Sequence, residues 1–188
     1  RLLKKSIGTT NNDEPLPLQR MRSRTRNCLE SIVESRLRML NNTTYKVWGC
    51  HQTMTITGKM VIAAATIKYP KVADEIEEDY KRVLAVVKSH VAVPHKPTNM
   101  RVLTGLTISP SRCIQELRKQ LKCGYRISPD TGYALAVVND VVVGSLIDVM
   151  VHIGKSLMKV NADGTTKMKS FTPRDIKQAV FSADHLQE

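Results

Sequence analysis

Residues 133–160 form a long and nearly continuous apolar run without a proline, and this run constrains the fold more than any other segment. Its central valines favour a strand by local preference. The run is too long for an ordinary strand, however, and its apolar residues recur at steps of three and four, as on one face of a helix. Helix start and stop signals flank it at 128–130 and 161–164. We therefore predict one long helix that extends to Val160.

Polar residues interrupt this predicted helix at Asn139, Asp140, Asp148 and His152. Such residues are rare in membrane-spanning segments, so we expect a helix inside a protein core and no membrane partner. His152 is interpreted as a core histidine and not as a ligand.

A second long helix is predicted in the first half of the chain, from about Leu16 to Leu40, where apolar residues again follow helical spacing. The polar residues 41–44 are expected to end it. Shorter helices are predicted elsewhere. They span 58–67, 72–91 and 110–122, with a last one from 173 onward. Thr55 or Thr57 is expected to cap the first of these.

The two halves of the chain repeat one order of elements: a short helix, a loop, a very long helix, a loop and a short helix. Two prolines mark residues 92–100 as the linker between a first half, 1–91, and a second half, 101–188. One such unit cannot bury its long helix alone, whereas two units clasped head to tail can bury both. A composition with 41% hydrophobic but only 4% aromatic residues also favours packed helices over a β-sandwich. We predict an all-α fold in which two tandem units form a pseudo-dimer within one chain.

The charge of the chain indicates a polyanionic partner. Lys and Arg number 29 against 17 Asp and Glu, which gives a formal net charge of +12. A protein that neutralises several phosphates gains affinity by releasing counterions, so nucleic acid is the leading candidate. A basic but merely solvated surface is the alternative.

No catalytic or metal-binding motif stands out in the sequence. The four cysteines form no CxxC pair, and the adjacent Cys50 and His51 are awkward partners for one zinc ion. A glycine-rich phosphate loop and a nucleophile motif are both missing from the sequence, and the five histidines are scattered. We expect a protein in a reducing compartment that is not an enzyme and uses no metal, cofactor or small-molecule substrate.

Several segments of the second half resemble histone 2A, and those of the first half resemble histone 2B. The histone 2A-like segments are 106–112, 116–119, 133–137, 171–180 and 184–186. The histone 2B-like features are Thr55-Ile56-Thr57 at a helix start, Pro70, and a long helix over 72–91. A 2B-like half followed by a 2A-like half resembles the histone doublets of giant DNA viruses, particularly the Marseillevirus group, over essentially the whole chain.

This resemblance implies two histone folds and a structural role in a nucleosome-like particle. Such a particle wraps and compacts double-stranded DNA by sequence-independent backbone and minor-groove contacts. The resemblance further implies assembly with a histone 4–histone 3 type doublet or dimer. The implied location is the virion, and the viral factory or nucleus of the infected cell, in association with a chromosome.

The resemblance also implies which residues contact DNA, because the family binds it where loops pair and where first helices point at the backbone. In the second half these residues are Arg112, Arg118 and Lys119 of the first helix, Arg126 of the first loop, and Lys167 and Lys169 of the second loop. Lysine lacks the planar fork of arginine, so weaker groove insertion is implied at the second loop.

In the first half, Lys46 is assigned to the loop that follows the long helix, while Thr53 replaces an arginine of the family. Alternating arginines near the start of the long helix are suited to phosphate contact, although a solvated helix end is the alternative. These are Arg20, Arg22, Arg24 and Arg26.

The acidic patch with which this histone pair binds other chromatin proteins is largely lost here. The matching positions are Asn139, Gly144, Ile147, Ala183 and His185, with Asp184 retained. We predict that patch-binding factors bind poorly, although residues 74–79 could supply a displaced acidic surface.

Two other function classes remain open. A histone-fold interaction subunit of a transcription-related complex would keep the helical clasp without needing basic residues at the paired loops. An RNA-binding helical domain would account for the charge but not for the repeat.

Overall fold

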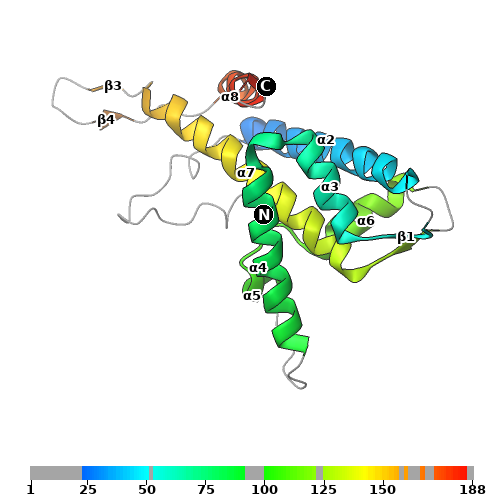
Figure 1. The fold of residues 1–188 in the computed structure, drawn as a ribbon. Coiled ribbons are helices and arrows are strands. Elements are labelled where there is room, and N and C mark those ends of the chain that lie inside the picture. The colour runs from blue at the N-terminus through cyan, green and yellow to red at the C-terminus, as the bar shows by residue number, and fades with distance from the viewer. Residues whose placement is uncertain are drawn as a thin grey trace. The chain divides into compact units, whose positions relative to one another are not determined.

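The computed structural model, shown in Figure 1, describes residues 23–50, 53–91, 100–121, 125–156, 159–160, 166–167 and 172–185. In this part of the chain the fold is all-α, with two pairs of two-residue strands. The described residues group into two compact units. One is Ser35–Val142, and the other combines the residues up to Glu34 with those from Val143 onward.

Helix α2 spans Ser23–Gly49, so the prediction that residues 41–44 end this helix is wrong. Asn41 and Thr44 are buried, and the packing of apolar residues such as Leu40 keeps this stretch helical against their weak helical preference. Thr43 donates its hydroxyl to the carbonyl of Met39 at 3.1 Å, a bond to the preceding turn that leaves the helix intact. The predicted start near Leu16 lies outside the described residues.

Strand β1 (Thr55–Ile56), helix α3 (Gly58–Lys68), the short 3-10 helix η2 (Pro70–Val72) and helix α4 (Ala73–Val91) follow in order. Both predicted helices of this region are thereby confirmed. Pro70 separates them because the residue before a proline is disfavoured in helical conformation. In α4 the acidic residues precede the basic ones, which is the order that the helix dipole favours.

Helices α5 (Met100–Thr104) and α6 (Pro110–Gln120) begin the second half. The short helix predicted from Pro110 is confirmed, whereas α5 was not expected, and Met100, assigned to the linker, is helical. The rest of the predicted linker, residues 92–99, lies outside the described part.

Strand β2 (Arg126–Ile127) leads into the long helix α7 (Pro129–Ser156). The prediction of one long helix here is confirmed, but its expected end at Val160 is wrong. That residue belongs instead to strand β3 (Lys159–Val160), which pairs antiparallel with β4 (Thr166–Lys167). The residues from Ala134 to Val138, in the first half of α7, are all buried, as their continuous apolar character requires.

Helix α8 (Pro173–His185) confirms the predicted last helix. Thr172 and Asp175 exchange hydrogen bonds at its start: the backbone N–H of Thr172 donates to the Asp175 carboxylate at 2.8 Å, and the Asp175 N–H donates to the Thr172 hydroxyl at 3.4 Å. This reciprocal pairing is that of a capping box. Ile176 and Ala179 form the buried face of the helix.

The core of the unit Ser35–Val142 is aliphatic and joins elements of both halves of the sequence. Its largest fully buried side chains are Leu40, Ile56, Val61, Ile76, Val83, Leu117, Leu135, Val137 and Val138. Gly132 allows α7 to approach α6 closely, because a Cβ there would lie 2.9 Å from the carbonyl oxygen of Pro110. This packing fixes the start of α7, and therefore the loop before it.

Candidate nucleic-acid interface

Two loops that are far apart in the sequence pair side by side in the unit Ser35–Val142. Strand β1 runs parallel to β2, with Thr55 opposite Arg126 and Ile56 opposite Ile127. The N–H of Arg126 donates to the carbonyl of Met54 at 3.0 Å, and the N–H of Ser128 donates to the carbonyl of Ile56 at 2.9 Å. Within the pair, the side chain of Ile56 is fully buried, whereas that of Arg126 is exposed. The pairing therefore presents an arginine to solvent on a fixed backbone.

Asp130, at the start of α7, ties this pair of loops to the helices behind it. Its carboxylate accepts from the backbone N–H of Gly58 at 3.1 Å and from the hydroxyl of Tyr80 at 2.9 Å. It also accepts from the hydroxyl of Ser128. Thr57 stands at the N-cap position of α3, yet its side chain makes no capping hydrogen bond there. Asp130 supplies a bond to this helix start across 72 residues of sequence.

Tyr80 of α4 is the buried member of this junction. Desolvation raises the pKa of its hydroxyl well above the ordinary value, and the hydrogen bond to the Asp130 carboxylate raises it further. The neutral hydroxyl is therefore the form that the folded chain keeps, and as a donor it links α4 to the start of α7.

Each of the paired loops lies in a stretch of sequence that contains no acidic residue: β1 lies in 35–73 and β2 in 117–129. Lys and Arg side chains are spread over both stretches. The exposed ones in the described part include Arg38, Lys46, Lys59, Arg118, Lys119 and Arg126. Asp130 follows the second stretch, but its carboxylate is engaged by Gly58 and Tyr80. The loop surface is therefore positive with few competing carboxylates.

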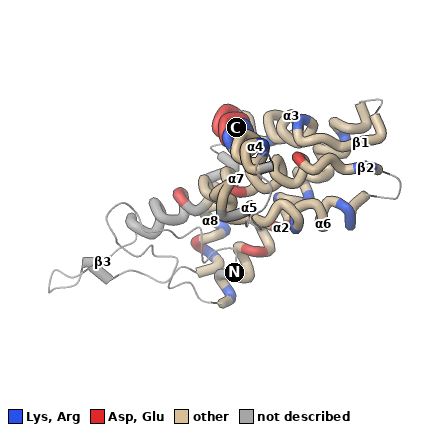
Figure 2. Tube along the Cα trace, turned by 90° about the horizontal axis from the view of Figure 1, so that it is seen from below, with Lys and Arg blue, Asp and Glu red and all other residues tan. Residues whose placement is uncertain are grey.

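Helix α6 carries a second set of cations, and Figure 2 shows blue segments on α6 and on β2. Its buried face holds Cys113 and Leu117, and its exposed face holds Arg112, Arg118 and Lys119. Burial raises the pKa of the Cys113 thiol to about 12, so this thiol is a packing residue and not a nucleophile.

The lowered pKa of Glu116 shows that several cations lie near α6. Lys119 donates to the Glu116 carboxylate at 2.7 Å, and this bond is the main reason that the pKa of Glu116 is lowered. The positive charges of Arg112 and of Arg38, on α2, lower it further. One carboxylate thus lies among three cations, which leaves an excess of positive charge on this face.

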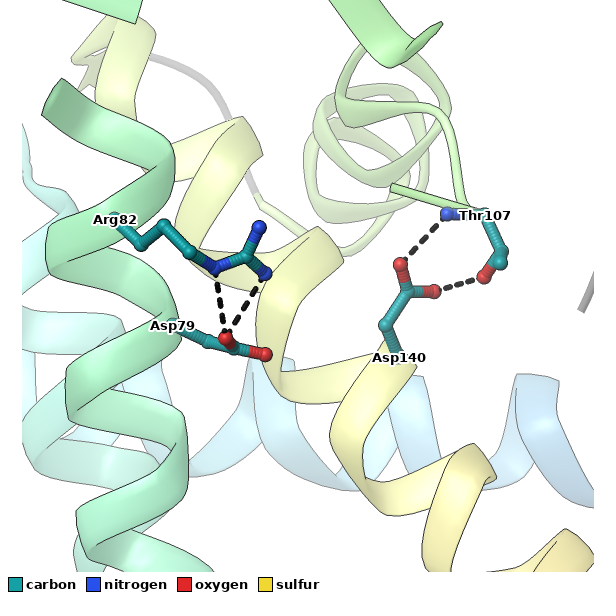
Figure 3. Close-up of polar contacts among 4 residues, drawn as sticks. All are labelled: Asp79, Arg82, Thr107 and Asp140. Atoms are coloured by element: carbon teal, nitrogen blue, oxygen red, sulfur yellow. Dashed lines mark hydrogen bonds and ion pairs between the residues drawn. The ribbon is translucent and has the colours of Figure 1, made fainter. Parts of the chain in front are cut away.

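The segment before α6 is held by Asp140 of α7, as Figure 3 shows. Its carboxylate accepts from the backbone N–H of Thr107 at 2.7 Å and from that of Ile108 at 3.3 Å, and also from the Thr107 hydroxyl. Asp140, a polar residue within the apolar run of α7, thereby holds the backbone that leads into α6 in place.

The structure places the sequence-predicted DNA-contact residues unevenly. Arg112, Arg118, Lys119 and Arg126 are exposed, and they lie in the same compact unit. Lys46 is exposed too, but it lies in the last turn of α2 and not in the loop to which it was assigned. Arg38 was missed by the sequence reasoning, although the absence of acidic residues from 35–73 could have pointed to it.

The remaining predicted contacts are less fully described. Arg24 is exposed on α2, and Arg26 lies in the same helix. Lys167 lies on β4 with its backbone opposite Lys159. Arg20, Arg22 and Lys169 lie outside the described residues.

Two observations bear on the predicted acidic surfaces. Asn139 is buried and donates its side-chain amide to the carbonyl of Leu135 at 2.6 Å, so it does not belong to a surface patch. On α4, part of the acidic cluster is paired within the helix. Arg82 binds Asp79 through two nitrogens, at 2.9 and 3.1 Å (Figure 3), and Lys81 binds Glu77 at 3.1 Å.

No helix in the described part of the chain is long and apolar enough to cross a membrane. The same residues include no group of His, Cys, Asp and Glu side chains that could hold a metal ion.

Comparison with known proteins does not assign the chain to a family. Its sequence matches no protein-family model, and no curated protein matches it significantly.

Proposed function

We propose that this protein packages DNA as a histone doublet, with a histone 2B-like half and a histone 2A-like half forming an intramolecular head-to-tail pair. The observation that carries the proposal is the parallel pairing of β1 with β2. It joins a loop of each half, and both loops come from stretches without acidic residues. An exposed arginine, Arg126, is one of the two residues that β2 contributes to this pairing.

The order of elements supports the doublet. In the first half, α2 is followed by β1 and α3, which is a long helix, a loop strand and a short helix. In the second half, α6, β2 and α7 form a short helix, a loop strand and a long helix, and α8 comes later. The pairing therefore joins the second loop of the first half to the first loop of the second half, as a head-to-tail arrangement requires.

The chemistry of the surface suits a sequence-independent contact with the DNA backbone. Exposed lysines and arginines on α6 and beside the paired loops can neutralise phosphates and release counterions. Arg126 on a rigid strand is suited to the minor groove, where histones insert arginine without reading bases. The proposal includes a histone 4–histone 3 type partner, and action on the DNA of a virion, a viral factory or an infected nucleus.

Nuclease protection of DNA tests this function. The chain is mixed with DNA at two salt concentrations, with and without a histone 4–histone 3 type partner. A discrete protected length that requires the partner is expected, because the proposed particle contains both proteins.

A smear of protection that disappears with salt, and that is the same with and without the partner, would contradict the packaging function. Partner binding without any protection would favour the other candidate, a histone-fold interaction subunit of a transcription-related complex.

A further inference from the structure

Three aromatic rings meet where the end of α2 lies against Tyr125, the residue that precedes β2. The chain has one tryptophan, five tyrosines and two phenylalanines, and Tyr45, Trp48 and Tyr125 gather here. The ring centroids of Trp48 and Tyr125 lie 4.5 Å apart at an interplanar angle of 75°, and those of Tyr45 and Trp48 lie 5.5 Å apart at 34°. We call these three side chains the aromatic cluster.

The cluster is ordered by its own contacts and yet remains open to solvent. The hydroxyls of Tyr45 and Tyr125 are 3.5 Å apart and share a hydrogen bond, which raises the pKa of Tyr125. Edge-to-face packing of Trp48 against Tyr125 is a favourable arrangement of two rings. Tyr45 nevertheless has 43% of its surface exposed. A large ring is thus held in place with much of its surface uncovered.

The cluster adjoins basic residues in the sequence. Each of the two tyrosines is followed directly by an exposed cation, Tyr45 by Lys46 and Tyr125 by Arg126. Both lie in the stretches without acidic residues, 35–73 and 117–129. An apolar peptide would gain nothing from these cations, whereas a nucleic acid strand can place a base on the ring and its phosphates near the lysine and arginine.

We propose that the aromatic cluster binds an unpaired base of a DNA strand by stacking it on Tyr45. The base must be unpaired or unstacked, because a base inside a duplex already has both faces covered by its neighbours. The proposal deepens the proposed function and rests on it, since it assigns to the same positive surface a preference for DNA with exposed bases. Such DNA occurs at strand ends, at kinks and in opened duplexes.

Trp48 is the sole tryptophan of the chain and reports on the cluster directly. The full chain is titrated with three probes of equal length: an oligothymidylate strand, an abasic deoxyribose-phosphate strand, and a duplex. The oligothymidylate is expected to change the emission of Trp48 and to bind about fivefold to 150-fold more tightly than the abasic strand, the range that stacking of about one base gives. The duplex is expected to bind without changing the emission.

Variants of Tyr45 separate stacking from charge. Tyr45→Ala is expected to remove the preference for oligothymidylate over the abasic strand, while Tyr45→Phe, which keeps the ring, is expected to retain it. Met39→Ala is the matched control, because Met39 lies on the same helix with 45% of its surface exposed. Thermal melting of each variant shows whether the fold is kept, and the Phe variant remains informative if the Ala variant unfolds.

The outcomes distinguish the two proposals. Equal affinity for the oligothymidylate and the abasic strand, or a preference that survives in Tyr45→Ala, overturns base stacking and leaves duplex packaging standing if the duplex still binds. Loss of the preference in Tyr45→Phe would also overturn it, because the hydroxyl and not the ring would then be responsible. Failure of all three probes to bind overturns both proposals.

Discussion

Gly58 and Tyr80 show at the scale of single residues how tightly the junction behind the paired loops is built. A Cβ at Gly58 would lie 2.1 Å from the Tyr80 hydroxyl and 2.7 Å from the Asp130 carboxylate. Any larger residue must displace both groups and break the bond from the Gly58 N–H to Asp130. Glycine is required here by space and not by backbone conformation.

Gly58→Ala is therefore expected to lower the free energy of unfolding by about 2 kcal/mol, as overpacking in a tight site does. Gly144→Ala is the control, since Gly144 lies within α7 and a Cβ added there would meet nothing within 4 Å. It should raise stability by about 0.5 to 1 kcal/mol through helix propensity. Urea unfolding of both variants measures this, and a Gly58→Ala variant that is as stable as the parent, or more stable, would show that the junction is not tight.

Tyr80→Phe tests the same junction chemically. The variant loses a hydrogen bond of 2.9 Å to a carboxylate, which should cost about 2 kcal/mol at neutral pH. Because the pKa of Tyr80 is raised in the folded state, the unfolded chain loses this proton first as pH rises above about 10. The contribution of Tyr80 to stability is present below that pH and declines above it.

Unfolding of the parent and of Tyr80→Phe is therefore compared from neutral to alkaline pH. The difference between the two free energies should shrink as pH rises above the ordinary tyrosine pKa. A difference that stays constant over this range would mean that the hydroxyl is not held neutral by the fold.

At the scale of elements, α2 shows a helix maintained by burial where its sequence favours a stop. Asn41 and Thr44 are almost fully buried, and the amide of Asn41 and the hydroxyl of Thr44 have no hydrogen-bond partner among the described residues. A buried polar group without a partner destabilises the fold. The helix therefore persists through these positions at the expense of stability, because Leu37 and Leu40 are buried before them and Trp48 packs against Tyr125 after them.

Thr44→Val should accordingly stabilise the protein by about 1 kcal/mol, since it replaces an unpaired buried hydroxyl by a methyl group of the same size. Thr43→Val is the matched control, one residue earlier, where the hydroxyl already bonds to Met39. It should change stability much less. Thermal melting of both variants measures the effect, and destabilisation by Thr44→Val would reveal a partner for its hydroxyl, such as an internal water.

At the scale of the whole molecule, the net charge of +12 is spread unevenly, because some elements carry mainly acidic residues and others mainly basic ones. The acidic residues at 74–79 gather in the first turns of α4, while α6 and the paired loops are rich in exposed cations. Some cations are already neutralised, such as Arg82, which binds Asp79. DNA affinity should therefore depend on which cation is removed and not on net charge alone.

Arg126→Gln and Arg82→Gln remove the same formal charge from different places. The first should weaken duplex binding and lower the salt dependence of the binding constant by about one unit of slope, as loss of one phosphate contact does. The second should change both little, because Arg82 is paired on α4. Binding titrations over a series of salt concentrations measure this, and equal effects of the two variants would show that only net charge matters.

The sequence alone determined the helices whose signals are local. Apolar spacing together with Pro70, Pro110, Pro129 and Pro173 predicted both ends of α3, α4 and α6 to within about two residues, and the starts of α7 and α8. The exposed cations of α6 were also predictable, because a short amphipathic helix must turn its charged side to water.

Tertiary structure decided what depends on contacts between distant segments. The strands β1 and β2 are each two residues long and have no periodicity to detect, and they exist because their loops meet. The capping bond to α3 comes from Asp130 and not from the expected threonines, and the aromatic cluster joins residues 80 positions apart. Helix α2 also continues through the polar residues 41–44, because the energy of packing exceeds the small differences in helix propensity between residues.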